Sequence, residues 1–376
     1  MEKGLRILHV TEAMAGGIAT VLQSFSERQR DAGADVSIYY LSRPESPSTN
    51  ELQARFGNNA SLRNFTGGRS KLRDYFALAV ALANAENSGD FDVIHLHSSK
   101  AGVIGRTIHL FTRRRAKLFY SPHGFAFLRE DVSRGTRQSI KLIETALAPI
   151  GSGLVLTCES ERRIAEEDLR SKSAYVVTTG VNEKSLAPAC EGTTSSAATA
   201  KLPYVERPKV GIVARVTYQK APWRFKAVAD SLSAQADFIW IGGGTPDKEK
   251  LWLGEHKPTG WLSPTELADA MKELDIFLFP TLWEGMPLAL LQAQAAGIPA
   301  VVSNVVGNCD AIADGETGYI CNSDEEIIKR TRQLIADSEL RRRMSKASRE
   351  RALQCLTDRD LGTQSLAIYA TSKKTK

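Results

Sequence analysis

Cysteine is scarce in this chain of 376 residues. The five cysteines are scattered, and no two of them form a CxxC pair: Cys158, Cys190, Cys309, Cys321 and Cys355. An odd and scattered set argues against a disulfide framework and against a zinc ribbon. It predicts reduced thiols in a cytosolic protein.

Long apolar runs are also missing. No stretch is long and apolar enough to span a bilayer, and the N-terminus passes almost directly into a predicted strand at residues 5–11, without the layout of a signal peptide. We therefore expect a cytoplasmic protein. Any membrane contact is expected to be peripheral, at the cytoplasmic face of the inner membrane.

The excess of positive over negative charge is modest: the formal net charge is +6. That sign suits nucleotides, lipid headgroups or nucleic acid, and it does not choose among them. The sequence contains no basic–aromatic stacking pattern and no known motif for reading nucleic acid. We therefore expect no nucleic-acid partner.

What the sequence does contain is two series of alternating strands and helices. Its 42% hydrophobic and 24% charged residues are typical of a globular protein, and its length exceeds one ordinary core, which predicts two domains. The first series has predicted strands at 5–11, 34–41, 92–97, 117–121, 153–158 and 174–178, with helices at 72–85, 101–111 and 137–147. This alternation predicts a doubly wound parallel sheet.

The pattern breaks at residues 183–208, a segment rich in Ser, Thr, Ala and Pro that we interpret as a linker. A second α/β series begins at residue 210. The expected organisation is one domain at 1–182, a second at 209–355, and a C-terminal tail at 356–376 that crosses back to the first. Ligands of open parallel sheets bind beyond the carboxyl ends of the strands, so we expect two sheets facing across a cleft that forms the site.

The stretch from Asp275 to Ser303 carries the strongest local pattern. An apolar strand at 276–279 ends at Pro280, and a loop leads through Glu284 into a helix at 288–296. A helix N-terminus attracts anions through its unpaired N–H groups and its dipole, so a diphosphate could lie there beside Glu284. The alternative is that Glu284 merely caps the helix.

Two further segments could contact phosphates. Arg215 and Lys220 follow the first strand of the second series, where a guanidinium fork and a point charge suit a diphosphate; a solvated basic loop is the alternative. Gly16 and Gly17 follow the first strand of the chain and permit close approach of phosphate oxygens, or simply form a tight turn. The pattern is not GxGxxG, so no dinucleotide is expected.

Histidines stand at the carboxyl ends of two strands in the first series. His123, within Ser-Pro-His-Gly, can donate to a sugar hydroxyl or hold charge near a reacting centre, or it is structural. His95 and His97 alternate on one strand and face the same way, which invites a metal. No third ligand of suitable spacing is visible, so the sequence predicts packing or a hydrogen bond there and no metal site.

A basic cluster lies on and after the predicted helix at 101–111. It is either a solvated helix end or a patch for anionic lipid, where each cation contributes roughly 1 kcal/mol. Its members are Arg106, Arg113, Arg114, Arg115 and Lys117.

Taken together, these residues resemble the retaining glycosyltransferases of family 4, enzymes of the GT-B type with two Rossmann-like domains. The resemblance covers nearly the whole chain. It rests on Gly16-Gly17, His123-Gly124, the Arg215…Lys220 pair, the turn Gly242–Gly244, the segment Thr259–Leu262, and the block EGMPLALLQAQAAGIPAVVS that begins at Glu284. It implies transfer of a hexosyl or N-acetylhexosaminyl group from a nucleoside-diphosphate sugar, expected to be a UDP-sugar. It also implies retention at the anomeric carbon, with no metal and no other cofactor.

The resemblance also implies a role for each matching position. Arg215 and Lys220 would hold the donor diphosphate, Glu284 would contact the hydroxyls of the donor sugar, and His123 would contact the sugar near the reacting carbon. The remaining donor-binding positions are Gly16, Gly17 and Gly243 in glycine turns, Gly260, Trp261 and Leu262 along the base, and Gly285, Met286 and Leu288 facing the phosphates.

One position departs from the family pattern. The second signature glutamate, eight residues after the first, holds the ribose hydroxyls in the family, and here it is Gln292. Glutamine keeps one acceptor and adds two donors, so ribose binding could survive with weaker, uncharged hydrogen bonds. A catalytically silent nucleotide- or partner-binding relative is therefore one alternative, and a GT-B nucleotide-sugar epimerase or phosphorylase is another.

A narrower resemblance concerns the acceptor. The segment from His97 to Gly102, together with His123-Gly124-Phe125, resembles bacterial enzymes that extend polyprenyl-diphosphate-linked glycans for capsule, exopolysaccharide or O-antigen. It implies that the N-terminal domain binds the acceptor, with Ser99, Lys100 and the basic cluster near its diphosphate and the membrane. No side chain stands out as a nucleophile. Same-face attack assisted by the leaving phosphate, as proposed for the family, is consistent with that absence.

Overall fold

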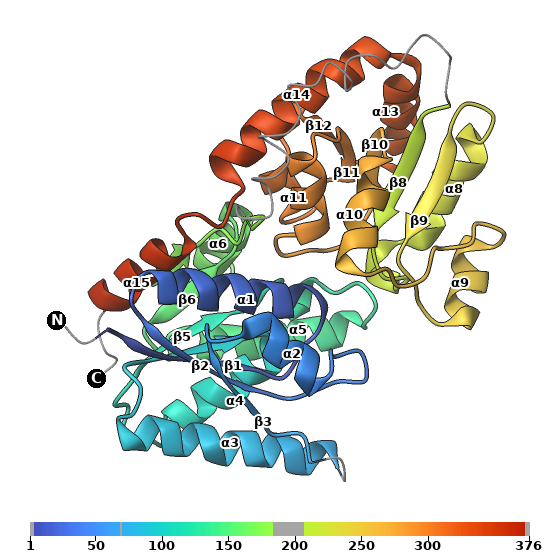
Figure 1. Cartoon of the computed structure of the whole chain (residues 1–376). Helices are drawn as coiled ribbons and strands as arrows, with labels where there is room; N and C mark the ends of the chain where they lie inside the picture. Colours follow the sequence, from blue (N-terminus) through green and yellow to red (C-terminus); the bar gives the residue numbers. More distant parts are fainter. Residues whose placement is uncertain (1–3, 68–69, 183–206, 373–376) are drawn as a thin grey trace. The chain divides into compact units, whose positions relative to one another are not determined.

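The computed structural model describes residues 4–67, 70–182 and 207–372. Most of the expected linker at 183–208 lies outside these residues. The chain divides into two compact units, each built around its own parallel sheet (Figure 1). The first unit comprises Met1–Leu128, Val132–Thr179 and Asp358–Lys376, and the second comprises Arg129–Asp131 and Gly180–Thr357.

The first unit contains a seven-stranded sheet in the order β3-β2-β1-β4-β5-β6-β7. All of its neighbouring strands are parallel. The strands are β1 (Arg6–Thr11), β2 (Asp35–Tyr40), β3 (Ser61–Asn64), β4 (Val93–His97), β5 (Lys117–Ser121), β6 (Gly153–Leu156) and β7 (Ala174–Val176). Since β2 and β4 flank β1 on opposite sides, the direction of winding reverses between β1 and β4.

Helices cover both faces of this sheet (Figure 1). They are α1 (Gly16–Asp31), α2 (Thr49–Phe56), α3 (Lys71–Ser88), α4 (Ser99–His109), α5 (Arg134–Leu147), α6 (Glu159–Glu167) and α15 (Leu361–Thr371), with a short 3-10 helix η1 (Ala126–Leu128). Although α15 follows the second unit in the chain, it packs on α1 of the first unit. Just before α15, buried Asp358 forms a 2.6 Å ion pair with Arg28 of α1.

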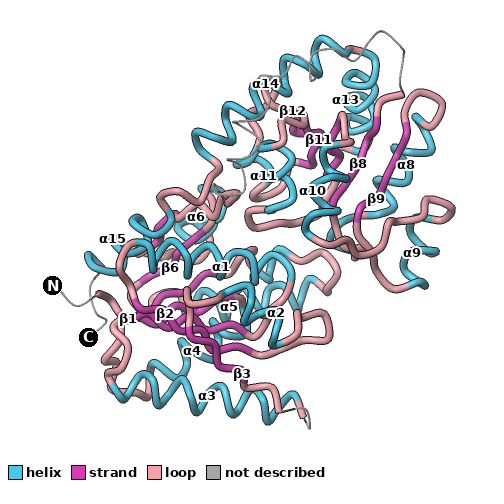
Figure 2. The backbone as a smooth tube through the Cα atoms, in the orientation of Figure 1, coloured by secondary structure: helices cyan, strands magenta, loops and turns pink. Residues whose placement is uncertain are grey.

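The second unit contains a five-stranded parallel sheet in the order β12-β11-β10-β8-β9. Its strands are β8 (Lys209–Val213), β9 (Asp237–Ile241), β10 (Ile276–Phe279), β11 (Ala300–Ser303) and β12 (Gly318–Cys321). Its helices are α8 (Pro222–Leu232), α9 (Pro246–Leu253), α10 (Pro264–Lys272), α11 (Leu288–Ala295), α12 (Asn308–Ala311), α13 (Asp324–Ala336) and α14 (Ser338–Cys355), with a 3-10 helix η2 (Tyr218–Lys220). Strands and helices alternate along the chain (Figure 2).

Local sequence explains where these elements begin. Proline at the first helical position opens α8, α9 and α10, where the missing N–H costs nothing. Ser263 and Glu266 form a capping box at α10, and the Ser323 side chain caps α13. The strand β10 is apolar and buried at every position, as a strand covered on both faces requires.

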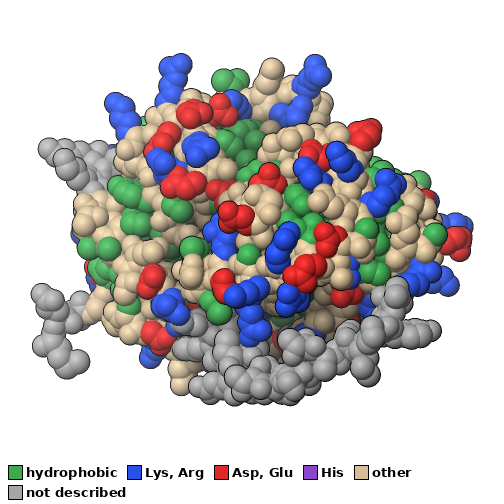
Figure 3. Space-filling model, turned by 90° about the horizontal axis from the view of Figure 1, so that it is seen from above, with side chains coloured by type: hydrophobic (Ala, Val, Ile, Leu, Met, Phe, Trp, Pro, Cys, Tyr) green, Lys and Arg blue, Asp and Glu red, His purple; other side chains and the backbone are tan. Residues whose placement is uncertain are grey.

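The surface carries charges of both signs. In the face shown in Figure 3, Lys and Arg side chains are interspersed with Asp and Glu side chains, in keeping with the modest net charge. None of the helices in the described residues is long and apolar enough to cross a membrane.

One member of the predicted basic cluster, Arg106, is not a surface cation, and a second, Lys117, is partly exposed and bonded to the backbone of α15. Arg106 is 1% exposed, forms a 2.7 Å ion pair with equally buried Glu144, and lies 4.0 Å from the centre of the Tyr120 ring. Lys117 donates at 2.7 Å and 2.8 Å to the last carbonyls of α15, those of Tyr369 and Ala370. The expectation that Arg106 could contact lipid was wrong, because the helix periodicity that places Arg106 on α4 does not reveal which face α5 covers.

The buried Arg106–Glu144 pair gives the first testable prediction. Glu144→Gln keeps the shape but leaves the Arg106 charge buried without its counter-ion, and we expect the free energy of unfolding to fall by about 3 kcal/mol. Chemical denaturation measures the loss. Glu159→Gln, in the exposed Arg162–Glu159 pair, is the control and should cost less than about 1 kcal/mol. Equal losses in the two variants would contradict the prediction.

Candidate active site

The best-formed candidate site lies at the winding reversal of the second sheet. The strands β8 and β10 are parallel neighbours, whereas β9 lies on the other side of β8. The loops that leave β8 and β10 therefore diverge from the same edge of the sheet, which is where open α/β sheets bind ligands. These two loops carry Lys220 and Glu284 respectively.

The two side chains form a close ion pair. Lys220 Nζ lies 2.6 Å from Glu284 Oε1, and the two side chains are 17% and 7% exposed. Gln219 holds the same loop by donating from its Nε2 to the Trp283 carbonyl at 2.7 Å and to Glu284 Oε2 at 3.3 Å. Lys220 Nζ also lies 4.8 Å from the centre of the Phe279 ring. This pair is shielded and fixed in position, unlike a mobile surface pair.

The N-terminus of α11 lies directly after this loop. The helix begins at Leu288, its N-cap is Pro287, and no side chain among the described residues makes a capping hydrogen bond there. The alternative in which Glu284 caps the helix is therefore wrong, because that carboxylate accepts from Lys220 and Gln219 instead. The first-turn N–H groups of α11 lack a side-chain cap, and such groups favour an anion.

A glycine outside the predicted set supports this loop. Gly307 has a φ of +79°, and a Cβ there would lie 1.4 Å from the Gly285 carbonyl oxygen. Only glycine allows the backbone before α12 to pack so closely on the Glu284 loop. Sequence reasoning missed Gly307, since an isolated glycine in a loop has no periodic signal.

The structure brings together the two glycine segments that the sequence singled out. Gly242 and Gly260 pair in an antiparallel bridge, and the Cβ position of Gly243 lies 3.3 Å from the Gly260 Cα. Beside them, Trp261 is 69% exposed while Leu262 packs on the apolar core. An exposed indole here is available to a planar ligand.

The other predicted donor positions lie around the same edge. Arg215 is exposed just beyond β8, and Gln292 is partly exposed in the second turn of α11. Met286 packs beside the core in the loop before α11.

The corresponding edge of the first unit lies beyond β1 and β4. Gly16, with a φ of +53°, begins α1 and is followed by Gly17. Ser99 begins α4, and Lys100 Nζ lies 3.2 Å from the Tyr75 hydroxyl and 5.3 Å from the centre of its ring.

Sequence reasoning missed a buried carboxylate at this edge. Glu12 follows β1 and is 4% exposed. It accepts from the Ala101 N–H at 3.2 Å and from the Ser98 hydroxyl, and it lies 3.4 Å from Arg43. Glu12 therefore already occupies the N-terminus of α4, where an anion would otherwise bind.

His123 is held rigidly at the end of β5. It has a φ of +53°, and the following Gly124 donates from its N–H at 2.7 Å to the fully buried Glu161 carboxylate. Glu161 in turn accepts from the N–H and the hydroxyl of Thr157, so the carboxylate ties two loops together.

The ring of His123 belongs to a histidine cluster that the sequence revealed only in part. His9 on β1 is in register with His95 on β4, and His9 Nδ1 lies 2.8 Å from His97 Nε2. His97 Nδ1 lies 2.8 Å from His123 Nε2. His9 was missed because its pairing depends on the neighbour relation of β1 and β4, which alternation on one strand cannot show.

Burial keeps these rings neutral. It lowers the pKa of His9 and of His123 to about 4 and holds the pKa of both His95 and His97 well below its usual range. Desolvation of the charged form is the main cause at every ring.

Comparison with solved structures identifies the class. A sucrose-phosphate synthase from Thermosynechococcus elongatus matches with a TM-score of 0.78 and 17% identity over 97% of this chain and 98% of that one. HepE from Anabaena, in complex with UDP and glucose, matches with a TM-score of 0.76 and 15% identity over 98% and 100%. The fold is thus that of the GT-B glycosyltransferases.

Two family models match the chain. Residues 15–185 match the model described as Glycosyltransferase Family 4, and residues 197–351 match Glycosyl transferases group 1. The protein is therefore a glycosyltransferase and belongs to family 4, as its motifs predicted.

Two of the sequence relatives are bacterial proteins. A 41.2 kDa protein in the cps region of Klebsiella pneumoniae is 26% identical over 85% of this chain and 87% of its own length. The Escherichia coli UDP-Gal:alpha-D-GlcNAc-diphosphoundecaprenol alpha-1,3-galactosyltransferase is 27% identical over 61% of this chain and 62% of its own.

The neutral histidines predict how stability depends on pH. Below pH 6.5 the unfolded chain binds protons at these positions, whereas folded His9 and His123 bind them only near pH 4. The stability of the first unit should therefore fall as the pH drops from 6.5, by about 1.4 kcal/mol per pH unit for each neutral ring.

Thermal unfolding between pH 7 and pH 5 tests this while most carboxylates stay ionised. Far-UV circular dichroism reports on both units, and fluorescence reports on the second, which contains all five tryptophans and one histidine. We expect the larger loss in the first unit. An unchanged first unit would show that the rings are not held neutral.

Proposed function

We propose that this protein is a retaining glycosyltransferase that moves a sugar from a UDP-sugar to a polyprenyl-diphosphate-linked glycan during synthesis of a bacterial surface polysaccharide. The observation that carries the proposal is the shielded Lys220–Glu284 pair beside the uncapped N-terminus of α11. A diphosphate joined to a sugar requires three kinds of binding group, and this place supplies all three: a cation, helix N–H groups and a carboxylate.

Each of these groups has a distinct part in the proposed transfer. Lys220 uses one of its three N–H donors on Glu284 and can offer the others to the diphosphate. Together with Arg215 and the first-turn N–H groups of α11, it would stabilise the negative charge that grows on the leaving diphosphate. Glu284, oriented by Lys220 and Gln219, would accept hydrogen bonds from the hydroxyls of the donor sugar.

Relatives support the donor and the acceptor class. The name of the Escherichia coli enzyme specifies a UDP-sugar donor and a diphosphoundecaprenol-linked acceptor. A Campylobacter jejuni relative, 27% identical over 40% of this chain and 41% of its own, is an N,N'-diacetylbacillosaminyl-diphospho-undecaprenol alpha-1,3-N-acetylgalactosaminyltransferase. We extend this acceptor class to the present chain.

Glu12 refines the proposed acceptor site. Because this carboxylate already accepts from the Ala101 N–H, the N-terminus of α4 is a poor site for a second anion. Lys100 can still contact an acceptor diphosphate as a point charge, with Ser99 beside it. Glu12 is better suited to accept from the acceptor's hydroxyls.

Peripheral membrane contact is proposed through α3 rather than through the full basic cluster. Leu72, Phe76 and Val80 recur every fourth residue on this helix and are 79%, 71% and 44% exposed. The exposed cations Lys71 and Arg73 flank the stripe. An apolar stripe beside cations is typical of helices that lie on anionic membrane surfaces.

Lys220→Ala tests the proposed chemistry. We expect transfer to fall about 10²–10³-fold or more, since a preorganised charge on the leaving group is lost. Glu284→Gln should also slow transfer severely and leave the fold intact. Product formation from nucleotide sugars, chosen by a thermal-shift screen of the wild-type protein, gives the rate.

Lys226→Ala is the matched control, because Lys226 forms an exposed ion pair with Asp230 one helical turn away. It should retain full activity. Undiminished turnover by Lys220→Ala would refute the assignment.

Phe76→Ser tests the membrane contact. Binding to vesicles that contain anionic phospholipid should weaken about tenfold, because about 1.5 kcal/mol of apolar transfer is lost. Leu251→Ser is the control, since Leu251 is 74% exposed in the second unit. Co-sedimentation measures both variants, and an equal effect of the two would rule out α3 as the contact.

Gln292 favours one second candidate, a catalytically silent relative that binds a nucleotide or a partner. A neutral amide at this position binds ribose hydroxyls less strongly than a carboxylate would. Donor hydrolysis or transfer by the purified wild-type protein would dismiss this candidate.

A further inference from the structure

The histidine cluster of the first unit forms one connected hydrogen-bond network. We propose that this network fixes His123 as the Nε2–H tautomer, so that its Nδ1 is available as an acceptor and not as a donor. The tautomer is argued from the structure alone, and the identity of the substrate group, a sugar hydroxyl, rests on the proposed function.

The direction of hydrogen-bond donation through the network, meaning which atom donates and which accepts at each contact, is set first at Gln29 on α1. The Ser365 hydroxyl donates to the Gly362 carbonyl at 2.9 Å, so its oxygen accepts from Gln29 Nε2 at 3.1 Å. The amide nitrogen of Gln29 therefore points toward α15. Its Oε1, 2.8 Å from His9 Nε2, must accept a hydrogen bond from the N–H of that ring nitrogen.

A second anchor gives the same direction. The Ser121 hydroxyl donates to the Val155 carbonyl, so it accepts from His95 Nε2 at 2.8 Å. His95 Nδ1 is then an acceptor, and the Tyr369 hydroxyl donates a hydrogen bond to it at 2.7 Å. The Tyr369 oxygen is thereby left to accept from Gln29 Nε2 at 3.3 Å, which agrees with the amide orientation set by Ser365.

The proton position on His9 then determines the proton position on each following ring. A neutral His9 that is protonated on Nε2 has an unprotonated Nδ1, which accepts from His97 Nε2 at 2.8 Å. His97 Nδ1 is consequently unprotonated and accepts from His123 Nε2, also at 2.8 Å. His123 carries its proton on Nε2, and its Nδ1 is left with a lone pair.

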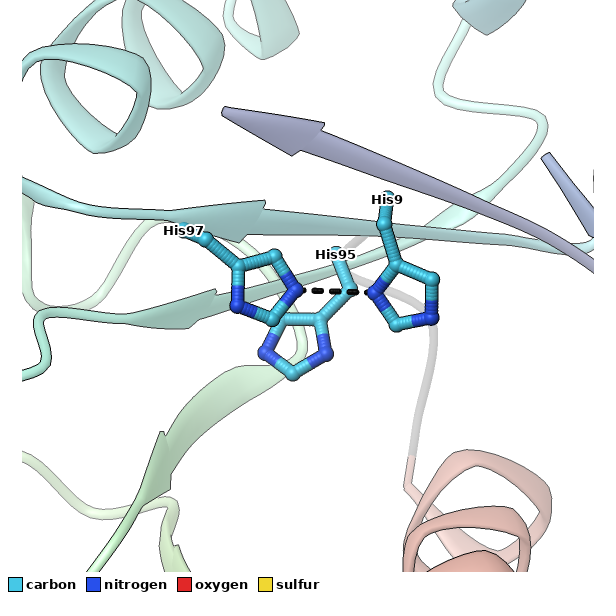
Figure 4. Close-up of side chains that lie close together, drawn as sticks. All are labelled: His9, His95 and His97. Atoms are coloured by element: carbon cyan, nitrogen blue, oxygen red, sulfur yellow. Dashed lines mark hydrogen bonds between the residues drawn. The ribbon is translucent and has the colours of Figure 1, made fainter. Parts of the chain in front are cut away.

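A metal would be the other explanation of this cluster, since His9, His95 and His97 have ligand atoms within 4.8 Å of one another. The rings lie side by side, and His9 and His97 are joined directly (Figure 4). Every ring nitrogen of these three histidines already has a hydrogen-bond partner. A network complete without an ion argues against a metal site.

The chemical consequence concerns what His123 can recognise. A neutral ring with a lone pair on Nδ1 accepts a hydrogen bond from a hydroxyl, and it cannot donate from Nδ1 to a phosphate oxygen. The ring therefore favours a sugar hydroxyl, and the cationic groups of the second unit remain responsible for the diphosphate. This assignment differs from the donor role that the sequence alone suggested for His123.

Nitrogen-15 NMR of the full chain labelled at histidine tests the tautomer, because protonated and unprotonated ring nitrogens differ widely in chemical shift. At pH 7.5 we expect a protonated Nε2 and an unprotonated Nδ1 at His123. Loss of one signal set in His123→Asn assigns the ring, and backbone-to-ring correlation assigns it if that variant does not fold. A proton on Nδ1, on the major tautomer or in an imidazolium ring, would overturn the proposal.

A pair of variants on α1 tests the origin of the direction. Gln29→Leu removes the acceptor for His9 Nε2, and a second tautomer should appear at His123. Gln23→Leu, on the same helix but outside the network, should leave the single tautomer unchanged. A single Nε2–H tautomer in both variants would show that Gln29 does not set the direction, and if Gln29→Leu does not fold the wild-type spectrum decides.

These spectra need no substrate, so their outcome is independent of whether transfer is found. In the active protein, the pH profile of kcat/KM should show no histidine titration between pH 6 and pH 8, and Gln29→Leu should lower kcat about tenfold through loss of one oriented hydrogen bond.

Discussion

Parallel pairing of all the strands is the constraint on which both units depend. It forces every loop with access to a ligand to leave the sheet at the same edge as its neighbours, and it buries the central strands on both faces. Where the winding reverses, two of those loops separate and leave room for side chains. In the second unit this place holds Lys220 and Glu284, and in the first it holds Glu12 and the start of α4. The same geometry therefore serves different ends in the two units: the Lys220–Glu284 ion pair lies beside a helix N-terminus without a side-chain cap in one, and the Glu12 carboxylate accepts from the helix N-terminus in the other.

Much of this arrangement could be predicted from the sequence, since strong periodicity and helix-end residues mark most elements. Strands such as β5 and β10 were predicted residue for residue. The strand β3 was not, because it lies at the sheet edge with mostly exposed side chains and has no apolar pattern. The start of α2 was also missed, although Ser48 and Glu51 form a capping box that the sequence spells out.

The site residues also divide into those that the local sequence reveals and those that depend on contacts distant in the chain. Positions next to a strand end, such as Lys220 and Glu284, can be found from the local pattern because topology dictates where strand ends lie. Residues that act through contacts distant in the chain cannot be found in this way. His9 depends on the pairing of β1 with β4, and Arg106 depends on which helix covers α4. Glu161 supports His123 through a backbone N–H, which leaves no trace in the sequence around His123.

The placement of α15 has a consequence for how the protein is made. Tyr369 and Ser365 complete the polar interior behind β1 and β4, yet they leave the ribosome only after the whole second unit. Until α15 is synthesised, the histidines and Gln29 of the nascent first unit lack these hydroxyl partners. Domains otherwise tend to fold in the order of their synthesis. The helix α15 thus acts as a closing segment, and the first unit, whose synthesis begins before that of the second, is completed after it.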